Sequence, residues 1–448
     1  MMNADLLEEK LRTDARMIFD EGLRAADPGV AVRRFVRLAP NGDITAGSSQ
    51  YRIQDIGRIF IVGAGKAAAP MTKALEELLG DALTGGVVTT KYGHGMPLDR
   101  VRLREAGHPV PDEEGLKGAR EIMDLLSEAR EGDLIFCLVS GGGSALMPMP
   151  VEGITLKDKQ SATGALLACG ATIHEINAIR KHISAVKGGK LARAAHPAKL
   201  ISLILSDVVG DDLDVIASGP TVPDRSTFAD CIEILAKYAI LDVVPPSVRS
   251  YLEAGVRGES PETVKAGDKV FDHEEHFIIG SASISLAAAK QKAESLGYHA
   301  AILSSCIEGE TREVAKALAA MAKEELLSSN PLQRPACLIS GGETTVTITG
   351  SGLGGRNMEF VLSAAMELSG WSPVCMLSGG TDGTDGPTDA AGAVADGRTI
   401  SRAMEKGLRA PDFLKGNDSY HFFESLGDLL ITGPTMTNVM DLRIILAG

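Results

Sequence analysis

Short glycine turns that follow apolar runs are the places in this sequence where side chains could do chemistry. The run Ile59–Val62 is followed by Gly63-Ala64-Gly65-Lys66 and then by a helical pattern. This order fits the G-x-G-x-x-G/A turn, in which N–H groups at a helix start bind a diphosphate. A dinucleotide site also needs an acid after the second strand, and the strand that ends at Lys91 has none. Lys66 instead places a cation where an anion is already favoured.

A buried strand followed by Ser-Gly-Gly occurs three times. The sets are Ser140-Gly141-Gly142, continued by Gly143 and Ser144, Ser340-Gly341-Gly342, continued by Glu343, and Ser378-Gly379-Gly380. Open α/β sheets bind ligands at the carboxyl ends of their strands, and glycine turns let N–H groups converge on an anion. The pattern therefore predicts a phosphate or carboxylate site, although strand-to-helix turns need glycine in any case.

Four Lys and Arg side chains and one histidine, His182, gather in the fourteen residues from Asn177 to Lys190, in a chain that is acidic as a whole. Arg180 and Lys187 are about two helical turns apart and can share a face, with Lys190 close by in sequence. Positive potential beside glycine loops suits a nucleotide or a sugar-acid phosphate. A solvated helix face is the alternative interpretation.

Two acidic loops are candidates for holding Mg²⁺. Asp207 follows an apolar strand, and Asp382 and Asp385 lie in a loop of repeated Asp-Gly pairs. Carboxylates at the end of a strand can share Mg²⁺ with phosphate oxygens. The second loop lacks the Glu that closes an EF-hand, and on spacing alone Asp-Gly turn formation explains it better.

Arg356 ends the glycine run Gly352–Gly355. A planar guanidinium there could bind a carboxylate or a transferring phosphoryl group through two hydrogen bonds. His94 and His108 lie in glycine-containing loops. Either could act as a base or a donor, although a lone loop histidine is more often structural.

The elements that must position these residues alternate between apolar β-branched runs and longer helical patterns. Strands are expected at 59–62, 86–90, 134–139 and 199–205, and beyond a polar stretch at 255–275 also at 276–280, 299–304, 336–339, 344–349 and 374–377. Near-continuous apolar strands between helices predict an α/β fold with mainly parallel sheets. We expect a first domain over 1–265 and a second over 276–448, whose last segment could pack back on the first.

Composition narrows the functional classes. The 448 residues favour two or three domains, and 45 basic against 59 acidic side chains give a net charge of −14. That charge disfavours nucleic acid and anionic membranes as partners. Six cysteines without a CxxC pair predict free thiols and a cytoplasmic location. No stretch reads as a membrane helix, and the first residues lack the pattern of a signal peptide.

The motifs together resemble the glycerate 2-kinase family, the class with a C-terminal MOFRL domain. The matching stretches, in family order, are 62–67, 107–112, 140–146, 177–190, 206–212, 216–224, 340–344, 354–357, 382–389 and 432–438. They extend over essentially the whole chain. The MOFRL region would cover about residues 335–440.

The resemblance implies ATP-dependent phosphorylation of D-glycerate at the 2-hydroxyl group with Mg²⁺, by a monomer or homodimer. It implies two three-layer α/β/α domains, the first Rossmann-like, with the active site in the cleft between them. It also gives Lys66 and Arg356 catalytic roles, in which they would neutralise the transferring group. Relatives are often labelled hydroxypyruvate reductases, so an NAD(P)H-dependent reductase is the alternative, followed by a non-catalytic binder of sugar acids or nucleotides.

Overall fold

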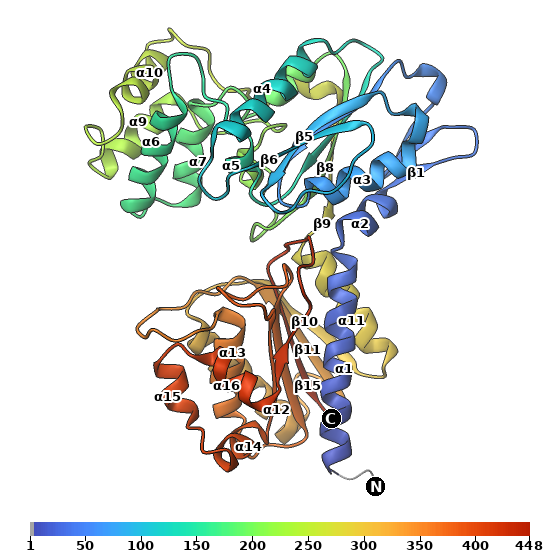
Figure 1. The fold of residues 1–448 in the computed structure, drawn as a ribbon, viewed down its shortest axis with the longest axis vertical. Helices are drawn as coiled ribbons and strands as arrows, with labels where there is room; N and C mark the ends of the chain where they lie inside the picture. Colours follow the sequence, from blue (N-terminus) through green and yellow to red (C-terminus); the bar gives the residue numbers. More distant parts are fainter. Residues whose placement is uncertain (1–3) are drawn as a thin grey trace. The chain divides into compact units, whose positions relative to one another are not determined.

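The computed structural model describes residues 4–448, and the chain forms two compact units (Figure 1). Unit 2 is Pro28–Ile279, and unit 1 combines the chain up to Asp27 with Gly280–Gly448. Both units contain a six-stranded sheet with helices, which confirms the predicted α/β class. No helix within residues 4–448 has the length and apolar character needed to span a membrane.

The sheet of unit 2 carries the first group of predicted turns. Its strands are β4 (Ile59–Ala64), β5 (Gly85–Lys91), β6 (Val101–Ala106), β7 (Leu134–Val139), β8 (Lys199–Leu205) and β9 (Glu274–Gly280). Their order is β6-β5-β4-β7-β8-β9, and the five strands β6, β5, β4, β7 and β8 run parallel to one another. The chain thus winds outward from β4 to one edge and then to the other. In such doubly wound sheets, ligands bind at the carboxyl ends where the order reverses, here β4 and β7.

Helices cover this sheet and form a second core beside it. They are α2 (Pro28–Phe35), α3 (Ala68–Leu79), α4 (Glu113–Ser127), α5 (Gly143–Leu146), α6 (Leu156–Ala168), α7 (Ile173–His182), α8 (Lys190–Ala195), α9 (Phe228–Lys237) and α10 (Pro246–Val256). Buried residues of α4, α5 and α8 pack on β4, β7 and β8. Those of α6, α7, α9 and α10 pack on one another. Capping boxes at Thr155, Thr172 and Thr227 define the first turns of α6, α7 and α9. Three short strands, β1 (Val36–Leu38), β2 (Ile44–Ala46) and β3 (Ser49–Tyr51), form a small antiparallel sheet.

The sheet of unit 1 is mixed. Its strands are β10 (His299–Ile307), β11 (Ala336–Gly342), β12 (Val374–Gly380), β13 (Gly392–Asp396), β14 (Leu429–Leu430) and β15 (Asp441–Ala447), in the order β10-β11-β15-β12-β13-β14. The final strand, β15, lies between β11 and β12 and is antiparallel to both. The last segment therefore completes the sheet of unit 1, and the alternative that it packs on the first domain is wrong. The strand expected at 344–349 does not form, apart from one bridge at Thr345.

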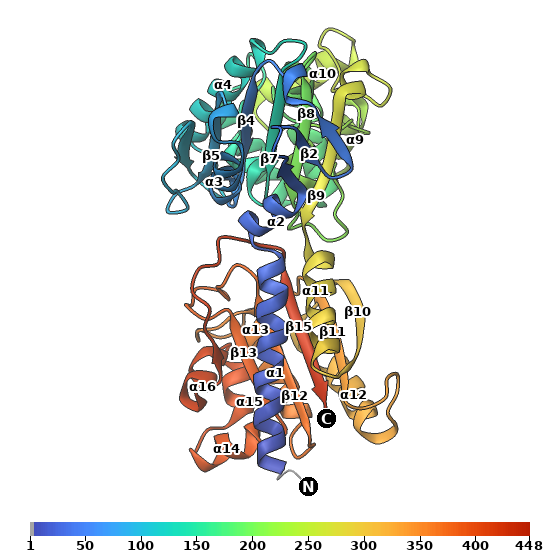
Figure 2. The ribbon, with the colours of Figure 1, turned by 90° about the vertical axis from the view of Figure 1, so that its right-hand side faces the viewer.

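Helices lie on both faces of the unit 1 sheet (Figure 1). They are α1 (Ala4–Ala25), α11 (Ala282–Ser295), α12 (Thr311–Ser328), α13 (Arg356–Glu367), α14 (Thr399–Glu405), α15 (Ala410–Lys415) and α16 (Ser419–Leu426). Helix α1 runs along β12 and β15 and packs on α11 (Figure 2). Leu11, Ile18 and Phe19 of α1 are fully buried there.

The division of the chain differs from the sequence-based one at two places. The expected first domain began at residue 1, whereas α1 belongs to unit 1. The expected second domain began at 276, whereas β9 pairs with β8 in the sheet of unit 2. Both differences arise because chain order alone does not say which sheet an apolar segment covers or extends.

Candidate functional site

In unit 2 the turns after β4 and β7 are in direct contact. A Cβ at Gly65, which has φ 153°, would lie 2.0 Å from Ser140 Oγ, so this position requires glycine. The Lys66 N–H donates to Gly141 O at 2.9 Å, and the Ala67 N–H donates to Ser140 Oγ at 3.0 Å. The structure thus brings together two turns that the sequence singled out separately.

Three further side chains lie around the same turns. A Cβ at Gly141 would lie 2.1 Å from Asp207 Oδ2, and one at Gly142 would lie 2.8 Å from the His108 ring and 3.5 Å from Lys66 Cγ. Gly142 has φ 82°, in the left-handed region. The backbone of Gly141 and Gly142 therefore lies close to Lys66, Asp207 and His108, because these two glycines carry no side chains.

The electrostatics of this group favour an anion. Burial, with the charges of Lys66 and Lys91 adding to it, lowers the pKa of His108 to about 4, so its imidazole is neutral at pH 7. Burial raises the pKa of Asp207, and Lys66 opposes that rise. Lys66 and Lys91 outnumber the carboxyl of Asp207 in this group, which leaves a positive potential that suits a phosphate or carboxylate.

A strained loop lies against the glycine turn. Ala217 and Ser218 both have left-handed backbones, with φ 51° and 61°, a conformation that costs about 1–3 kcal/mol per residue. Ser218 Oγ donates to Asn177 Oδ1 at 3.0 Å and lies 3.0 Å from Ser144 Oγ. Ser144 and Asn177, which the sequence predicted independently, are thus joined through Ser218. Sequence reasoning gave Ser218 no role, although it lies in the stretch 216–224 noted for its family resemblance.

Most of the cations in the basic stretch 177–190 hold the fold together. Lys187 donates to the carbonyl oxygens of Ser144 at 2.9 Å and Met147 at 3.4 Å. Lys190 donates to those of Ser184 at 2.5 Å and Lys181 at 3.2 Å. The solvated helix face is therefore wrong for Lys187 and Lys190, because both ammonium groups are buried against carbonyl oxygens.

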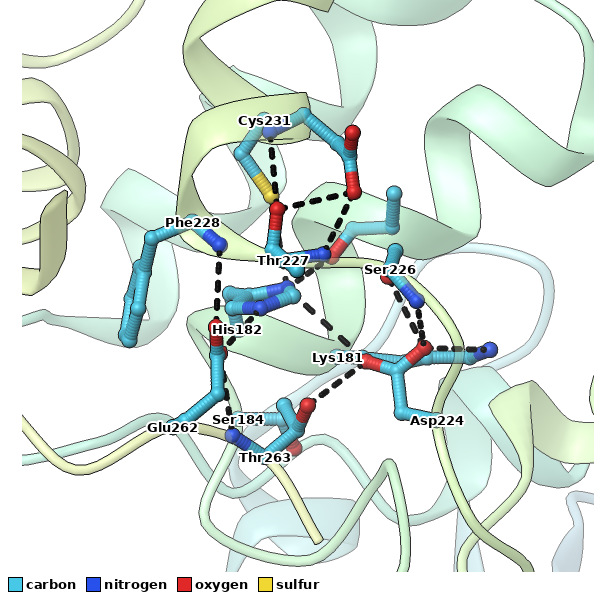
Figure 3. Close-up of polar contacts among 12 residues, drawn as sticks. Lys181, His182, Ser184, Asp224, Ser226, Thr227, Phe228, Cys231, Glu262 and Thr263 are labelled. Atoms are coloured by element: carbon cyan, nitrogen blue, oxygen red, sulfur yellow. Dashed lines mark hydrogen bonds and ion pairs between the residues drawn. The ribbon is translucent and has the colours of Figure 1, made fainter. Parts of the chain in front are cut away.

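The end of α7 forms a buried polar network (Figure 3). Lys181 pairs with Asp214 and, at 3.3 Å, with Asp224. His182 lies 2.7 Å from Glu262 Oε1 through Nε2 and 2.7 Å from the Ala178 carbonyl oxygen through Nδ1. These two residues are satisfied within the protein. Arg180 is the exception in this stretch, since within residues 4–448 no hydrogen bond or ion pair engages its guanidinium.

In unit 1, Arg356 begins α13 and is held by two carboxylates. Its Nε and Nη2 donate to Asp441 Oδ2 and Oδ1 at 2.8 and 3.0 Å, and Nη1 lies 2.8 Å from Glu343 Oε1. Burial works against the charge of Arg356, but Asp441 outweighs it and raises the pKa of the guanidinium. Arg356 stays partly exposed, with 29% of its side-chain surface accessible.

Two of the Ser-Gly-Gly turns frame this arginine site. Asp441 pairs in register with Gly342 on one side and Gly380 on the other, and Arg443 pairs with Ser340 and Ser378. Arg443 Nη2 donates to Asp441 Oδ2 at 3.0 Å. Sequence reasoning missed Asp441 and Arg443 because it did not predict β15.

Asp382 and Asp385 make local contacts. Asp385 Oδ1 accepts the Asn357 N–H at 3.1 Å and Oδ2 accepts the Met358 N–H at 2.8 Å, so this carboxyl caps α13. Burial raises its pKa to about 7. Asp382 Oδ1 accepts the Thr384 N–H at 3.2 Å, an Asx turn. No group of three or more His, Cys, Asp or Glu in residues 4–448 could form a metal site, so metal binding by these aspartates stays a prediction.

Comparisons with known proteins cover nearly the whole chain. Residues 14–253 match a domain family described as of unknown function, DUF4147, and residues 336–441 match the MOFRL family. A glycerate 2-kinase of Pyrococcus horikoshii is 44% identical over 99% of this chain and 98% of its own length. A D-glycerate 2-kinase of Thermotoga maritima is 45% identical over 87% and 91%. A protein of Agrobacterium vitis named putative hydroxypyruvate reductase is 43% identical over 97% and 94%.

Solved structures agree with this match. A Pyrococcus horikoshii protein superposes with a TM-score of 0.88 at 43% identity, covering 97% of this chain and 98% of that one. A glycerate kinase of Thermotoga maritima gives 0.88 at 42% identity, covering 98% and 100%.

Proposed function

The chain belongs to the glycerate kinase family that combines DUF4147 and MOFRL domains, and we propose that it phosphorylates D-glycerate at the 2-hydroxyl group with ATP. The observation that carries the proposal is the similarity to glycerate kinases over nearly the full length of both chains. The cationic glycine turn of unit 2 supports it, because such a turn suits a phosphate. Free cysteines throughout residues 4–448 accord with the cytoplasmic location that we propose.

Phosphoryl transfer requires mainly positioning and charge stabilisation from a protein. We propose that Lys66 and Arg356 supply the cations that stabilise the transferring group. Lys66 is half-buried beside the turns after β4 and β7. Arg356 is oriented by Asp441 and keeps part of its surface accessible. The turn Ser140–Ser144 in unit 2 and the turn Ser340–Glu343 in unit 1 would contact substrate oxygens.

Asp207 is the aspartate whose surroundings fit Mg²⁺ best. Its carboxyl lies against the glycine turn after β7, and the charge of Lys66 partly offsets the rise in pKa that burial causes. Mg²⁺ in kinases usually takes one or two carboxylates together with phosphate oxygens. When bound, the ion would neutralise charge on those oxygens. Asp207 would hold it, and Asp382 and Asp385 remain the proposed second candidates.

A reductase acting on hydroxypyruvate is the second candidate, because some relatives carry that name. A nicotinamide dinucleotide would need an acid at the end of β5 for its ribose. That strand ends in Thr90 and Lys91, and Thr90 Oγ1 donates to Gly65 O at 3.1 Å. The kinase is therefore preferred.

The test is an assay of ADP formation with ATP, Mg²⁺ and D-glycerate, with 2- and 3-phosphoglycerate separated as products. Oxidation of NAD(P)H by hydroxypyruvate is measured in parallel. Formation of 2-phosphoglycerate supports the proposal. Rapid NAD(P)H oxidation without glycerate-dependent ADP formation would overturn it.

A further inference from the structure

Lys159, near the start of α6, is a buried lysine without a partner. Its residue exposure is 4%, and within residues 4–448 its Nζ has no hydrogen-bond acceptor. An ammonium group removed from water is costly unless it is paired or hydrogen-bonded. The other buried lysines nearby meet that requirement through carbonyl oxygens or carboxylates, as Lys187 and Lys181 do. Lys159 therefore has donors available for a group that the protein itself does not supply.

Arg180 of α7 is the second cation without a partner. It is mostly buried, and burial lowers its pKa with no carboxylate opposing the change. Arg180 also acts on Lys159: burial lowers the pKa of Lys159, and the charges of Lys187, Lys190 and Arg180 lower it further. The cations that face Lys159 come from α7, α8 and the loop before α8, and no acid contributes. Such a cluster repels itself and is relieved by an anion.

This cluster adjoins the glycine turn of unit 2. Lys187, which faces both Lys159 and Arg180, donates to the Ser144 carbonyl oxygen. Asn177 and Arg180 are three residues apart on α7, on the same face. Asn177 binds Ser218, which contacts Ser144. Arg180 is less buried than Lys159, so a ligand at this turn would reach Arg180 first and Lys159 behind it.

We propose that Lys159 and Arg180 form a binding site for one anionic oxygen group of a substrate, a carboxylate or a phosphate. The shared chemistry is a compact group of negatively charged oxygens that accepts hydrogen bonds from an ammonium and a guanidinium. The proposed function, on which this inference rests, supplies two sources of such a group. They are the carboxylate of D-glycerate and a phosphate of the nucleotide.

The contrast with the network of Figure 3 supports this assignment. There Lys181 is also fully buried, and Asp214 and Asp224 neutralise it. The fold therefore pairs the buried lysine of α7 that stabilises the structure with two carboxylates. No carboxylate pairs with Lys159 or Arg180 within residues 4–448, so an acidic ligand is the group that would neutralise them.

The experiment measures binding by calorimetry with three probes: D-glycerate, ADP and inorganic phosphate. The variants are Lys159→Met and Arg180→Gln, and the control is Lys157→Met, an exposed lysine on the same helix. Losing one charge-assisted hydrogen bond should weaken binding about 10-fold to 100-fold. A loss confined to D-glycerate identifies the carboxylate as the ligand. A loss confined to ADP and phosphate identifies the nucleotide.

Proton uptake on binding provides a second measurement, which Lys159→Met would leave unchanged if Lys159 only stabilised the fold. Burial and the neighbouring cations lower the pKa of Lys159, and a bound anion would raise it again. Anion binding should therefore be coupled to proton uptake, and the wild-type binding heat for D-glycerate should depend on the ionisation enthalpy of the buffer. Lys159→Met should lose that dependence, while Lys157→Met keeps it. Wild-type affinity for all three probes in both folded variants would overturn the proposal. If wild-type protein fails to phosphorylate glycerate but binds phosphate through Lys159, the proposed function fails and the anion site stands.

Discussion

Arg356 and Asp441 are joined by two parallel hydrogen bonds, Nε to Oδ2 at 2.8 Å and Nη2 to Oδ1 at 3.0 Å. Arg356 starts a helix after a glycine run, and Asp441 starts the last strand of the chain. This planar pairing fixes the orientation of the guanidinium. It leaves Nη1 toward Glu343, whose side chain is about half exposed.

Asp441→Asn should misplace Arg356. The substitution keeps the shape of the side chain but leaves Arg356 and the buried Arg443 without their shared carboxylate. Breaking a buried ion pair costs about 3–5 kcal/mol. Urea unfolding followed by fluorescence of Trp371, the only tryptophan in the sequence and a residue of unit 1, measures that loss. Glu343→Gln, which breaks the more exposed pair, should cost under about 1 kcal/mol. Equal losses in the two variants would contradict this interpretation.

Lys66→Ala and Arg356→Ala should lower kcat more than they raise KM, because both cations would act on charge that develops during transfer. Losing one such donor costs about 3–4 kcal/mol, a factor on the order of 10²–10³. Lys66→Arg should restore little activity, since a planar fork cannot replace a compact ammonium. Lys66→Ala should melt like wild type, whereas Arg356→Ala should melt lower because it leaves Asp441 and Glu343 with one partner fewer.

Steady-state kinetics of both single variants and the double variant decide this prediction. If both cations act on the same charge, the double variant should lose less than the product of the single losses. Folded single variants with kcat within about threefold of wild type, far below the expected loss, would remove both residues from the mechanism.

Asp207→Asn and Asp385→Asn should separate metal binding from helix capping. Asp207→Asn should raise the Mg²⁺ concentration needed for half-maximal activity without lowering the melting temperature, because burial already disfavours its charged form. Asp385→Asn should lower the stability of unit 1 by about 0.5–2 kcal/mol, since Asp385 accepts two N–H groups of α13. If Asp385→Asn also changes the Mg²⁺ requirement, the carboxyl has both tasks. Wild-type Mg²⁺ dependence in both variants would show that the metal lies elsewhere.

Sequence reasoning pointed to those residues of the candidate site that depend on local patterns. Apolar runs ending in glycine turns located Lys66, Ser140 and Ser340 because strand, turn and helix are encoded by neighbouring residues. It could not find Asp441, because its role comes from β15 lying between two strands far away in sequence. It also could not tell Lys187, bound to carbonyl oxygens, from the unpartnered Arg180, since only tertiary packing distinguishes them.

Helix α1 should stabilise unit 1 and not unit 2. Leu11→Ala and Ile18→Ala each remove a fully buried side chain from the core that α1 forms with α11, β12 and β15. Each should cost about 2–5 kcal/mol. The unfolding transition of unit 1, which Trp371 fluorescence reports, should move to a lower urea concentration. The unfolding transition of unit 2, which only circular dichroism detects, should stay at the same urea concentration. Met17→Ala, on the exposed side of α1 at 39% exposure, is the control. A shift of the other transition would assign α1 to unit 2.

Glu274 should make the stability of unit 2 depend on pH. This side chain on β9 is 3% exposed, and within residues 4–448 neither carboxyl oxygen has a hydrogen-bond partner. His276 Nε2 lies 3.8 Å from Oε2, but burial lowers the pKa of His276 and so disfavours the imidazolium that would pair with a carboxylate. Burial therefore raises the pKa of Glu274 to about 9 in the folded protein, against about 4.5 in the unfolded chain.

The sign of the effect follows from these two values. The unfolded chain loses this proton near pH 4.5 and the folded protein keeps it until about pH 9, so its contribution is fully present below pH 4.5 and is lost as the pH rises toward 9. Glu274→Gln carries no titrating proton. The free energy of unfolding of the variant relative to wild type should therefore rise with pH, by up to about 1.4 kcal/mol per pH unit. Urea titrations by circular dichroism at pH 6, 7 and 8 measure it, with the exposed Asp272→Asn as control. A difference that does not change with pH would mean that Glu274 is ionised in the folded protein.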